Sequence, residues 1–144
     1  MKLKASTLVA SLLLVAGVAI AADATDPTVK AWQETMDANG AAAKELGGMA
    51  GGKVPFDAAA AEAAKASLVA HAGDIAVKFA TKASDPASKA SPDIWTNWDD
   101  FAAKAKALET AAAALDVTSA ETIGAGMGPI GGACKDCHTK YRLP

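Results

Sequence analysis

The stretch that decides the fold stands near the end of the chain, where residues 131–142 read GGACKDCHTKYR. It holds the only two cysteines of the 144-residue sequence, Cys134 and Cys137, and His138 follows directly after the second. On a helix, this spacing places both sulfur atoms on one side. A disulfide between residues so close would constrain very little of the unfolded chain, so it would stabilise the protein weakly. The cluster is better explained by chemistry than by crosslinking.

Cys-x-x-Cys-His is the spacing of covalent haem attachment, in which two thiols bond to the porphyrin vinyl groups and the histidine binds the iron. Three alternatives stay open. A redox dithiol would expect a strand–helix context, which the sequence does not offer. A zinc site would need four ligands, and beyond the cluster only His71 and carboxylates are available. The third is a plain disulfide. We favour one covalent haem c, because a porphyrin would also fill a core with only three Phe, three Trp and one Tyr.

The N-terminus predicts export. Residues 1–21 combine two lysines, an apolar run and a small-x-small end (AIA), which together are typical of a cleaved secretory signal. The alternative is an uncleaved membrane anchor, for which the apolar run is short. We therefore expect a periplasmic protein with one domain over residues 22–144 and no membrane insertion. Removing two of the 14 basic residues leaves 12 against 16 acidic ones, a formal net charge of −4, which argues against nucleic-acid binding.

Four helical segments are predicted, and no segment has the alternation of a strand. They cover residues 27–46, 57–79, 93–115 and 119–142, and the prolines and glycines between them mark the breaks. The connection at 81–92 is polar, and we expect no core residue in it. Short connections between helices of similar length favour an all-α fold, an antiparallel up-down-up-down four-helix bundle around the haem.

Apolar spacing also predicts which residues face the core. In the third segment, large apolar residues and alanines alternate three and four apart, as on the inner face of a bundle helix. The expected inner faces of the first two segments are Val29, Trp32 or Gln33, Met36, Gly40 and Ala43, and then Ala61, Ala64, Leu68, His71 and Ile75. In the last segment we expect Pro129 to shorten or kink the start of the helix, and the glycines around it to let the backbone approach the haem.

The chain resembles the class II cytochromes c, that is, cytochrome c′ and its low-spin relatives. Three stretches carry the resemblance, which spans the whole chain after the signal: GPIGGACKDCHTKYR at 128–142, SPDIWTNWDDF at 91–101 and KVPFDAAA at 53–60. The resemblance implies thioether bonds from Cys134 and Cys137 to the haem, and an axial bond from His138 to the iron.

The resemblance implies roles in the haem site for further residues. Arg142 would lie beside the axial histidine, one helical turn after it, and Phe79 would pack near the haem edge. Gln33 keeps the position expected near a haem propionate, while Trp32 stands where the family usually has an arginine. Met36 would face the sixth coordination site of the iron.

Met36 decides between two functions. If its thioether binds the iron, the haem is six-coordinate and low-spin and suits electron transfer, which is the function we favour. If it does not bind, the iron stays five-coordinate and binds nitric oxide or carbon monoxide. Met49 and Met127 are weaker ligand candidates, and His71 is expected to be a core residue rather than a ligand.

The expected partners follow from these two functions. They are periplasmic redox proteins in the first case, and nitric oxide or carbon monoxide in the second. We do not expect an enzyme, because a peroxidase would need distal polar groups and none is evident near Met36. The resemblance also implies that a homodimer would form through the first two helices. Their expected outer residues are small and permit close approach: Ala41, Ala42, Ala60 and Ala63.

Overall fold

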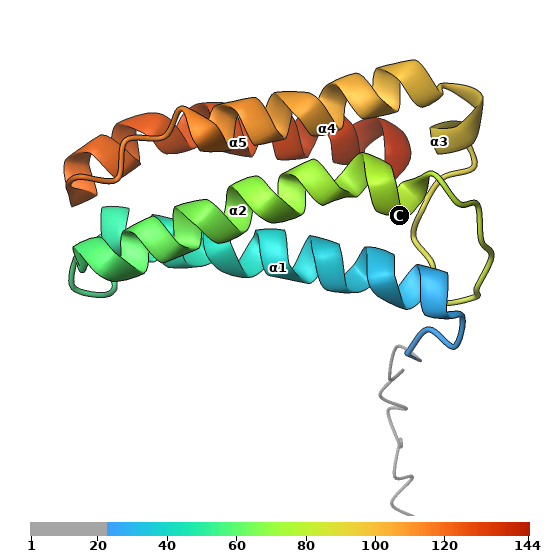
Figure 1. The fold of residues 1–144 in the computed structure, drawn as a ribbon, viewed down its shortest axis with the longest axis horizontal. Helices are drawn as coiled ribbons and strands as arrows, with labels where there is room; N and C mark the ends of the chain where they lie inside the picture. The colour runs from blue at the N-terminus through green and yellow to red at the C-terminus, as the bar shows by residue number, and fades with distance from the viewer. Residues whose placement is uncertain (1–22) are drawn as a thin grey trace, which may run out of the picture.

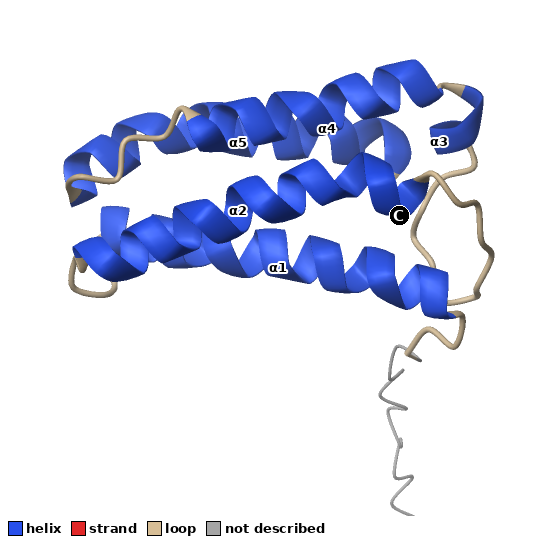
Figure 2. Cartoon of the chain, in the orientation of Figure 1, coloured by secondary structure: helices blue, strands red, loops and turns tan. Residues whose placement is uncertain are grey.

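The computed structural model describes residues 23–144, so the predicted signal at 1–21 lies outside the described residues. Within them the chain forms five helices, α1 (Pro27–Ala50), α2 (Ala58–Phe79), α3 (Asp93–Thr96), α4 (Trp98–Ala113) and α5 (Ala120–Tyr141). The four long helices lie alongside one another, and α1 contacts both α2 and α5 while α4 contacts the same two (Figure 1). The rest of the described chain is loop (Figure 2). The predicted all-α four-helix bundle is confirmed.

Helix α1 begins as predicted and ends later than predicted. The Asp26 carboxylate accepts hydrogen bonds from the backbone N–H groups of Thr28 and Val29, at 2.7 and 3.1 Å, and so caps the first turn. We predicted the end at residue 46, before two glycines, but the helix continues to Ala50. Each interior glycine costs about 1 kcal/mol. Burial of Met49 on the extra turn outweighs that cost.

The inner faces of α1 and α2 differ from the prediction. The buried residues of α1 are Val29, Trp32, Thr35, Asn39, Ala42, Leu46 and Met49. After Trp32, the buried residues Thr35, Asn39 and Ala42 each precede by one position the predicted Met36, Gly40 and Ala43. Neighbouring positions on a helix of 3.6 residues per turn can both fit an apolar pattern, so the packing partners decide which of them is buried. In α2 the predicted Ala61, Ala64, Leu68 and Ile75 are buried. His71 is half-buried, and the neighbouring Ala72 is the buried residue at that level. Met36 consequently lies at the edge of the buried stripe.

The predicted third helix is divided. Asn97 adopts φ −125° and ψ 45°, which separates the single turn of α3 from α4. Its side-chain amide donates to the backbone oxygen of Asp93 at 3.2 Å, and this local bond competes with helix continuation. Both parts still reach the core: Ile94 of α3 is buried, and so are Phe101 and Leu108 of α4.

Helix α5 runs unbroken through Pro129, so the expectation that this proline shortens it was wrong. The helix begins at a capping box, in which Ser119 and Thr122 bond each other's backbone N–H groups. Its glycines are not among the residues that line the pocket described below, and their expected role in letting the backbone approach a haem stays a prediction. Gly126 packs closely on the segment after α4: a Cβ at this position would contact Leu115 Cδ1, so an alanine there would force the buried Leu115 side chain to shift.

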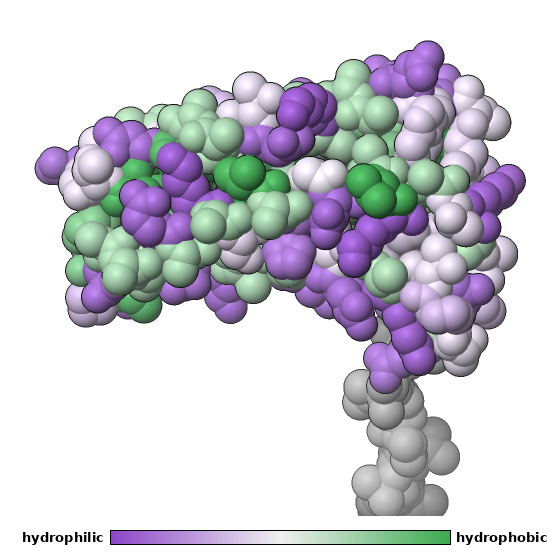
Figure 3. Space-filling model, viewed as in Figure 1, coloured by the Kyte–Doolittle hydropathy of each residue, from purple (hydrophilic) through white to green (hydrophobic). Residues whose placement is uncertain are grey.

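The surface is mixed in character. On the face in Figure 3, apolar residues form small groups separated by polar ones. Among the described residues, the large hydrophobic side chains that are exposed are Val54, Phe56, Val77 and Leu143. None of the described helices is long and apolar enough to cross a bilayer.

Candidate haem pocket

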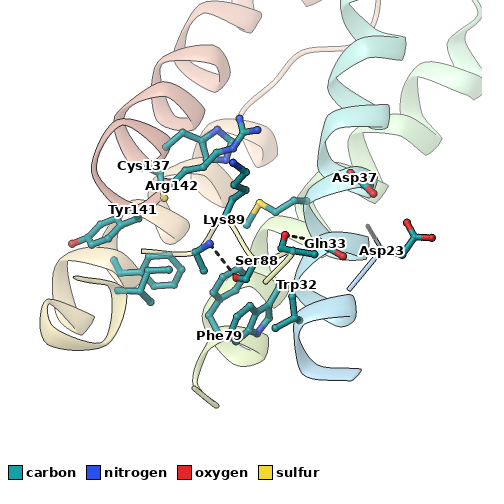
Figure 4. Close-up of a pocket in the computed structure, with 17 residues that line it drawn as sticks. Asp23, Trp32, Gln33, Asp37, Phe79, Ser88, Lys89, Cys137, Tyr141 and Arg142 are labelled. Carbon is teal, nitrogen blue, oxygen red and sulfur yellow. Dashed lines mark hydrogen bonds between the residues drawn. The ribbon is translucent and has the colours of Figure 1, made fainter. Parts of the chain in front are cut away.

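A pocket of about 580 Å³ opens at the end of the bundle where α1, the C-terminal ends of α2 and α5, and the loop between α2 and α3 meet (Figure 4). This volume is within the range of ligand pockets, about 300–1,000 Å³. Six of the seven residues predicted from the sequence line it: Gln33, Met36, Phe79, Cys137, His138 and Arg142. The seventh, Cys134, does not line it but lies half-buried against the core, one turn before Cys137.

The C-terminal end of α5 carries the nucleophilic and ligating groups. Both thiols are free, and burial raises the pKa of Cys134 and of Cys137, so both are protonated at neutral pH. Burial, and then the charge of Arg142, lower the pKa of His138. The imidazole is therefore kept neutral, which is the form that binds a metal. Arg142 is held beside it, because its backbone N–H donates to the His138 carbonyl at 3.1 Å.

Aromatic side chains form the inner wall of the pocket. Trp32 is 2% exposed and stacks on Phe79, with ring centroids 4.7 Å apart and planes 13° apart. Its indole N–H donates to the Lys78 carbonyl at 2.8 Å, and the Trp95 indole donates to the Phe79 carbonyl at the same distance. Two of the carbonyls left free at the end of α2 are thereby satisfied. This stacked wall suits the flat apolar face of a porphyrin.

Two alternatives to haem, a zinc site and a thioredoxin-type dithiol, lack the surroundings that they need in the described residues. Across residues 23–144, no group of three or more His, Cys, Asp and Glu side chains is placed to hold a metal ion, so a zinc site has no ligand set. The same part of the chain contains no strand beside the cysteines, so the context of a thioredoxin-type dithiol is also missing. A haem fits what is present: an apolar wall, paired thiols and a neutral imidazole on one helix, and the Met36 thioether on another.

Comparison with known proteins agrees with this geometry. The family described as Cytochrome C′ matches residues 27–142. The chain belongs to the cytochrome c′ family. It is 37% identical to cytochrome c-556 of Agrobacterium fabrum over 110 residues, 69% of this chain and 75% of that protein. It is 33% identical to cytochrome c′ of Cereibacter sphaeroides over 105 residues, 68% of this chain and 70% of that protein.

A solved cytochrome c′ shows that the fold is shared at lower identity. The nitric oxide complex of a cytochrome c′ variant from Alcaligenes xylosoxidans superposes with a TM-score of 0.71. It is 24% identical, and the match covers 81% of this chain and 94% of that one. Members of the cytochrome c′ family carry covalently bound haem c, and they are monohaem electron carriers or nitric oxide binders.

The mouth of the pocket in this family member is formed by the loop after α2, whose role sequence reasoning missed. We expected no core residue between 81 and 92, yet Ser91 is buried, and Ser88 and Lys89 line the pocket. The Gln33 side-chain amide donates to the Ala87 carbonyl at 3.3 Å, which ties the loop to α1. The loop's polar composition concealed this role, because only its long-range contacts reveal it.

Proposed function

We propose that this protein is a periplasmic monohaem c-type cytochrome that carries one electron. Cys134 and Cys137 would attach the haem, and His138 and Met36 would be its axial ligands. The observation that carries the proposal is that Met36 and His138, which are about one hundred residues apart in sequence, line one pocket from two different helices. A haem bound there supplies one-electron iron chemistry.

The residues of this pocket support that chemistry in separate ways. Partial desolvation of His138, whose side chain stays exposed, and then the positive charge of Arg142 lower its pKa and favour the neutral imidazole. The stacked Trp32 and Phe79 exclude water from the inner wall. A thioether such as that of Met36 is a weak, polarisable ligand that raises the reduction potential of a haem protein. Each of these roles is performed by a side chain that the pocket already contains.

A visible spectrum of the purified protein, oxidised and reduced, with and without carbon monoxide, tests the proposal. A low-spin spectrum that is indifferent to carbon monoxide supports electron transfer through a coordinated Met36. A complete lack of haem absorbance, in a host competent for haem attachment, would exclude the proposed cofactor and with it the function.

The second candidate function is reversible binding of nitric oxide or carbon monoxide by a five-coordinate haem. It is favoured by the shared fold of the Alcaligenes xylosoxidans protein, which was solved with nitric oxide bound. The wall of Trp32 and Phe79 would give such a ligand apolar surroundings. In this case the spectrum is high-spin and shifts when carbon monoxide is added.

Export and assembly are further parts of the proposal. Cleavage after residue 21 would give a mature protein that begins at Ala22, which N-terminal sequencing of the periplasmic fraction tests. A homodimer would use the outer face of α1 and α2, where Ala41 and Ala63 are exposed beside a shallow hollow. Ala42 is buried between the helices instead, so it does not belong to that outer face as we had expected. Analytical ultracentrifugation distinguishes monomer from dimer.

A further inference from the structure

We propose that Lys89, on the loop between α2 and α3, binds a haem propionate at the mouth of the pocket. The inference deepens the proposed function, since it rests on a haem being attached in this pocket. It assigns a cofactor-binding role to a residue that neither the haem motif nor the first helix would indicate.

The first helix leaves the propionates without a positive charge. A haem c carries two propionates, and a carboxylate at the edge of an apolar pocket needs a cation or hydrogen-bond donors. Three residues of α1 on this side of the pocket supply no cation. Trp32 is neutral and directed into the core, where it donates to Lys78. The Gln33 amide donates to the loop, and the Asp37 carboxylate would repel a propionate.

Two cations do line the pocket within the described chain, Lys89 and Arg142. Arg142 is held close to His138, and its positive charge lowers the pKa of that imidazole. Lys89 comes from the loop instead. Figure 4 shows it next to Arg142, with Gln33 and Asp37 of α1 on the other side of the pocket. Of the two cations, Lys89 is therefore the one that comes from the loop rather than from the segment that carries the axial histidine.

The backbone of Lys89 is fixed relative to the helix that carries the cysteines. Its carbonyl accepts a hydrogen bond from the Leu143 N–H at 2.7 Å, and Ala90 forms an antiparallel bridge with Arg142. The Ser91 N–H donates to the Tyr141 carbonyl at 2.9 Å. These contacts tie the loop to the end of α5, so a haem attached to α5 would meet Lys89 at a defined position.

The ammonium group of Lys89 already engages an oxygen at this edge. Its Nζ donates to a backbone oxygen of Pro144. An ammonium has three donors, so it can hold that oxygen and still bind a carboxylate. A cation within about 4–6 Å lowers the pKa of a carboxyl group by one unit or more. Loss of Lys89 should therefore raise the proton affinity of one propionate about tenfold.

The test follows the propionates directly. Wild-type protein, Lys89→Gln and Lys89→Arg are produced with haem labelled with ¹³C at the propionate carboxyls, and each signal is titrated by NMR. Reduced protein saturated with carbon monoxide is used, because it is diamagnetic whether or not Met36 is a ligand. Lys82→Gln is the matched control, since it removes the same charge from the same loop at a residue outside the pocket.

We expect one propionate to titrate about one pKa unit higher in Lys89→Gln, and to keep its wild-type value in Lys89→Arg and in Lys82→Gln. The titration is interpreted against the ionisable groups that line the pocket besides Lys89, which are Asp23, Asp37, Cys137, His138, Tyr141 and Arg142. An unchanged propionate in Lys89→Gln, or an equal shift in Lys82→Gln, overturns the assignment while leaving the haem proposal intact. Absence of any labelled signal means that no haem is attached, and it overturns the proposed function as well.

Discussion

At the scale of single residues, the pocket depends on side chains whose surroundings decide their chemistry. Met36 is half-buried at the edge of the α1 core stripe, and it reaches the pocket rather than the centre of the bundle. Met49 is buried and Met127 half-buried, and neither lines the pocket. Of these three thioethers, only that of Met36 is therefore placed to act as a sixth ligand.

Replacement of Met36 separates the two proposed functions. If Met36 binds the iron, Met36→Ala converts a low-spin spectrum to a high-spin one and makes the haem reactive towards carbon monoxide. Met127→Ala is the control, because it removes the same side chain from a site outside the pocket. A Met36→Ala spectrum that matches the wild type would exclude Met36 as a ligand.

Trp32 shows how a residue that departs from the family pattern can gain a structural role. It is buried, stacked on Phe79 and bonded to the Lys78 carbonyl. Trp32→Phe keeps an aromatic ring but removes the donor, and should lower the free energy of unfolding by about 1–3 kcal/mol. Trp32→Ala also removes the ring and should cost about 3–5 kcal/mol. Urea denaturation of the haem-loaded variants measures both, and equal losses would mean that the stacking contributes nothing.

At the scale of helices, the sequence predicted which helices are present better than it predicted where each helix begins and ends. The four long helices follow from local patterns, because capping residues, prolines and apolar spacing are local signals. The clustering of Met36 with the CKDCH motif was implied instead by the resemblance to the class II cytochromes c. The glycine pair in α1 and Asn97 between α3 and α4 misled the prediction, since burial of Met49 and a side-chain bond to Asp93 decided those positions. The burial of Met49 is a tertiary contact, which helix propensity does not reveal, and the Asn97 bond is one of several local conformations open to an asparagine.

The glycines of α5 differ in what surrounds them, which predicts opposite effects for the same substitution. Alanine is the better helix former by about 1 kcal/mol. At Gly128 nothing lies within 4 Å of an added Cβ, so Gly128→Ala should stabilise the protein by up to that amount. At Gly126 the added Cβ meets buried Leu115, and overpacking typically costs about 1–3 kcal/mol. In thermal unfolding, the Tm of Gly126→Ala should therefore be clearly lower than the Tm of Gly128→Ala. Equal Tm values would contradict the close packing of Gly126 on Leu115.

At the scale of the whole molecule, the loop after α2 links the start of α1 to the end of α5 at the pocket end of the bundle. The loop after α2 bonds to Gln33 of α1 on one side and to the residues after α5 on the other. The Asp85 carboxylate of this loop accepts from the Thr25 N–H at 2.7 Å and from the Asp26 N–H at 3.0 Å. It also accepts from the Ala87 N–H at 2.8 Å. One side chain thus joins the start of α1 to the loop that forms the pocket mouth.

These bonds make Asp85 a source of acid sensitivity. Backbone hydrogen bonds from Asp26, Ala87 and Thr25 hold the pKa of Asp85 well below its usual range. A carboxyl whose folded pKa is depressed stabilises the protein fully above its unfolded pKa of about 3.9, and that contribution is lost as the pH falls towards the folded value. Asp85→Asn should therefore have a lower Tm than the wild type at pH 7, and the difference should shrink as the pH falls below about 4.

Thermal unfolding followed by circular dichroism measures this difference in Tm. The series runs from about pH 2 to about pH 7, because it must extend below and above the ordinary carboxyl pKa of about 3.9. Asp99→Asn is the control, because it removes a carboxylate from an exposed position on α4 at the same end of the bundle. If Asp85→Asn and Asp99→Asn lower Tm equally at every pH, net charge rather than the bonded loop explains the effect. A gap between Asp85→Asn and wild type that closes only in acid, with Asp99→Asn close to wild type throughout, would identify the Asp85 bonds as the link between α1 and the pocket mouth.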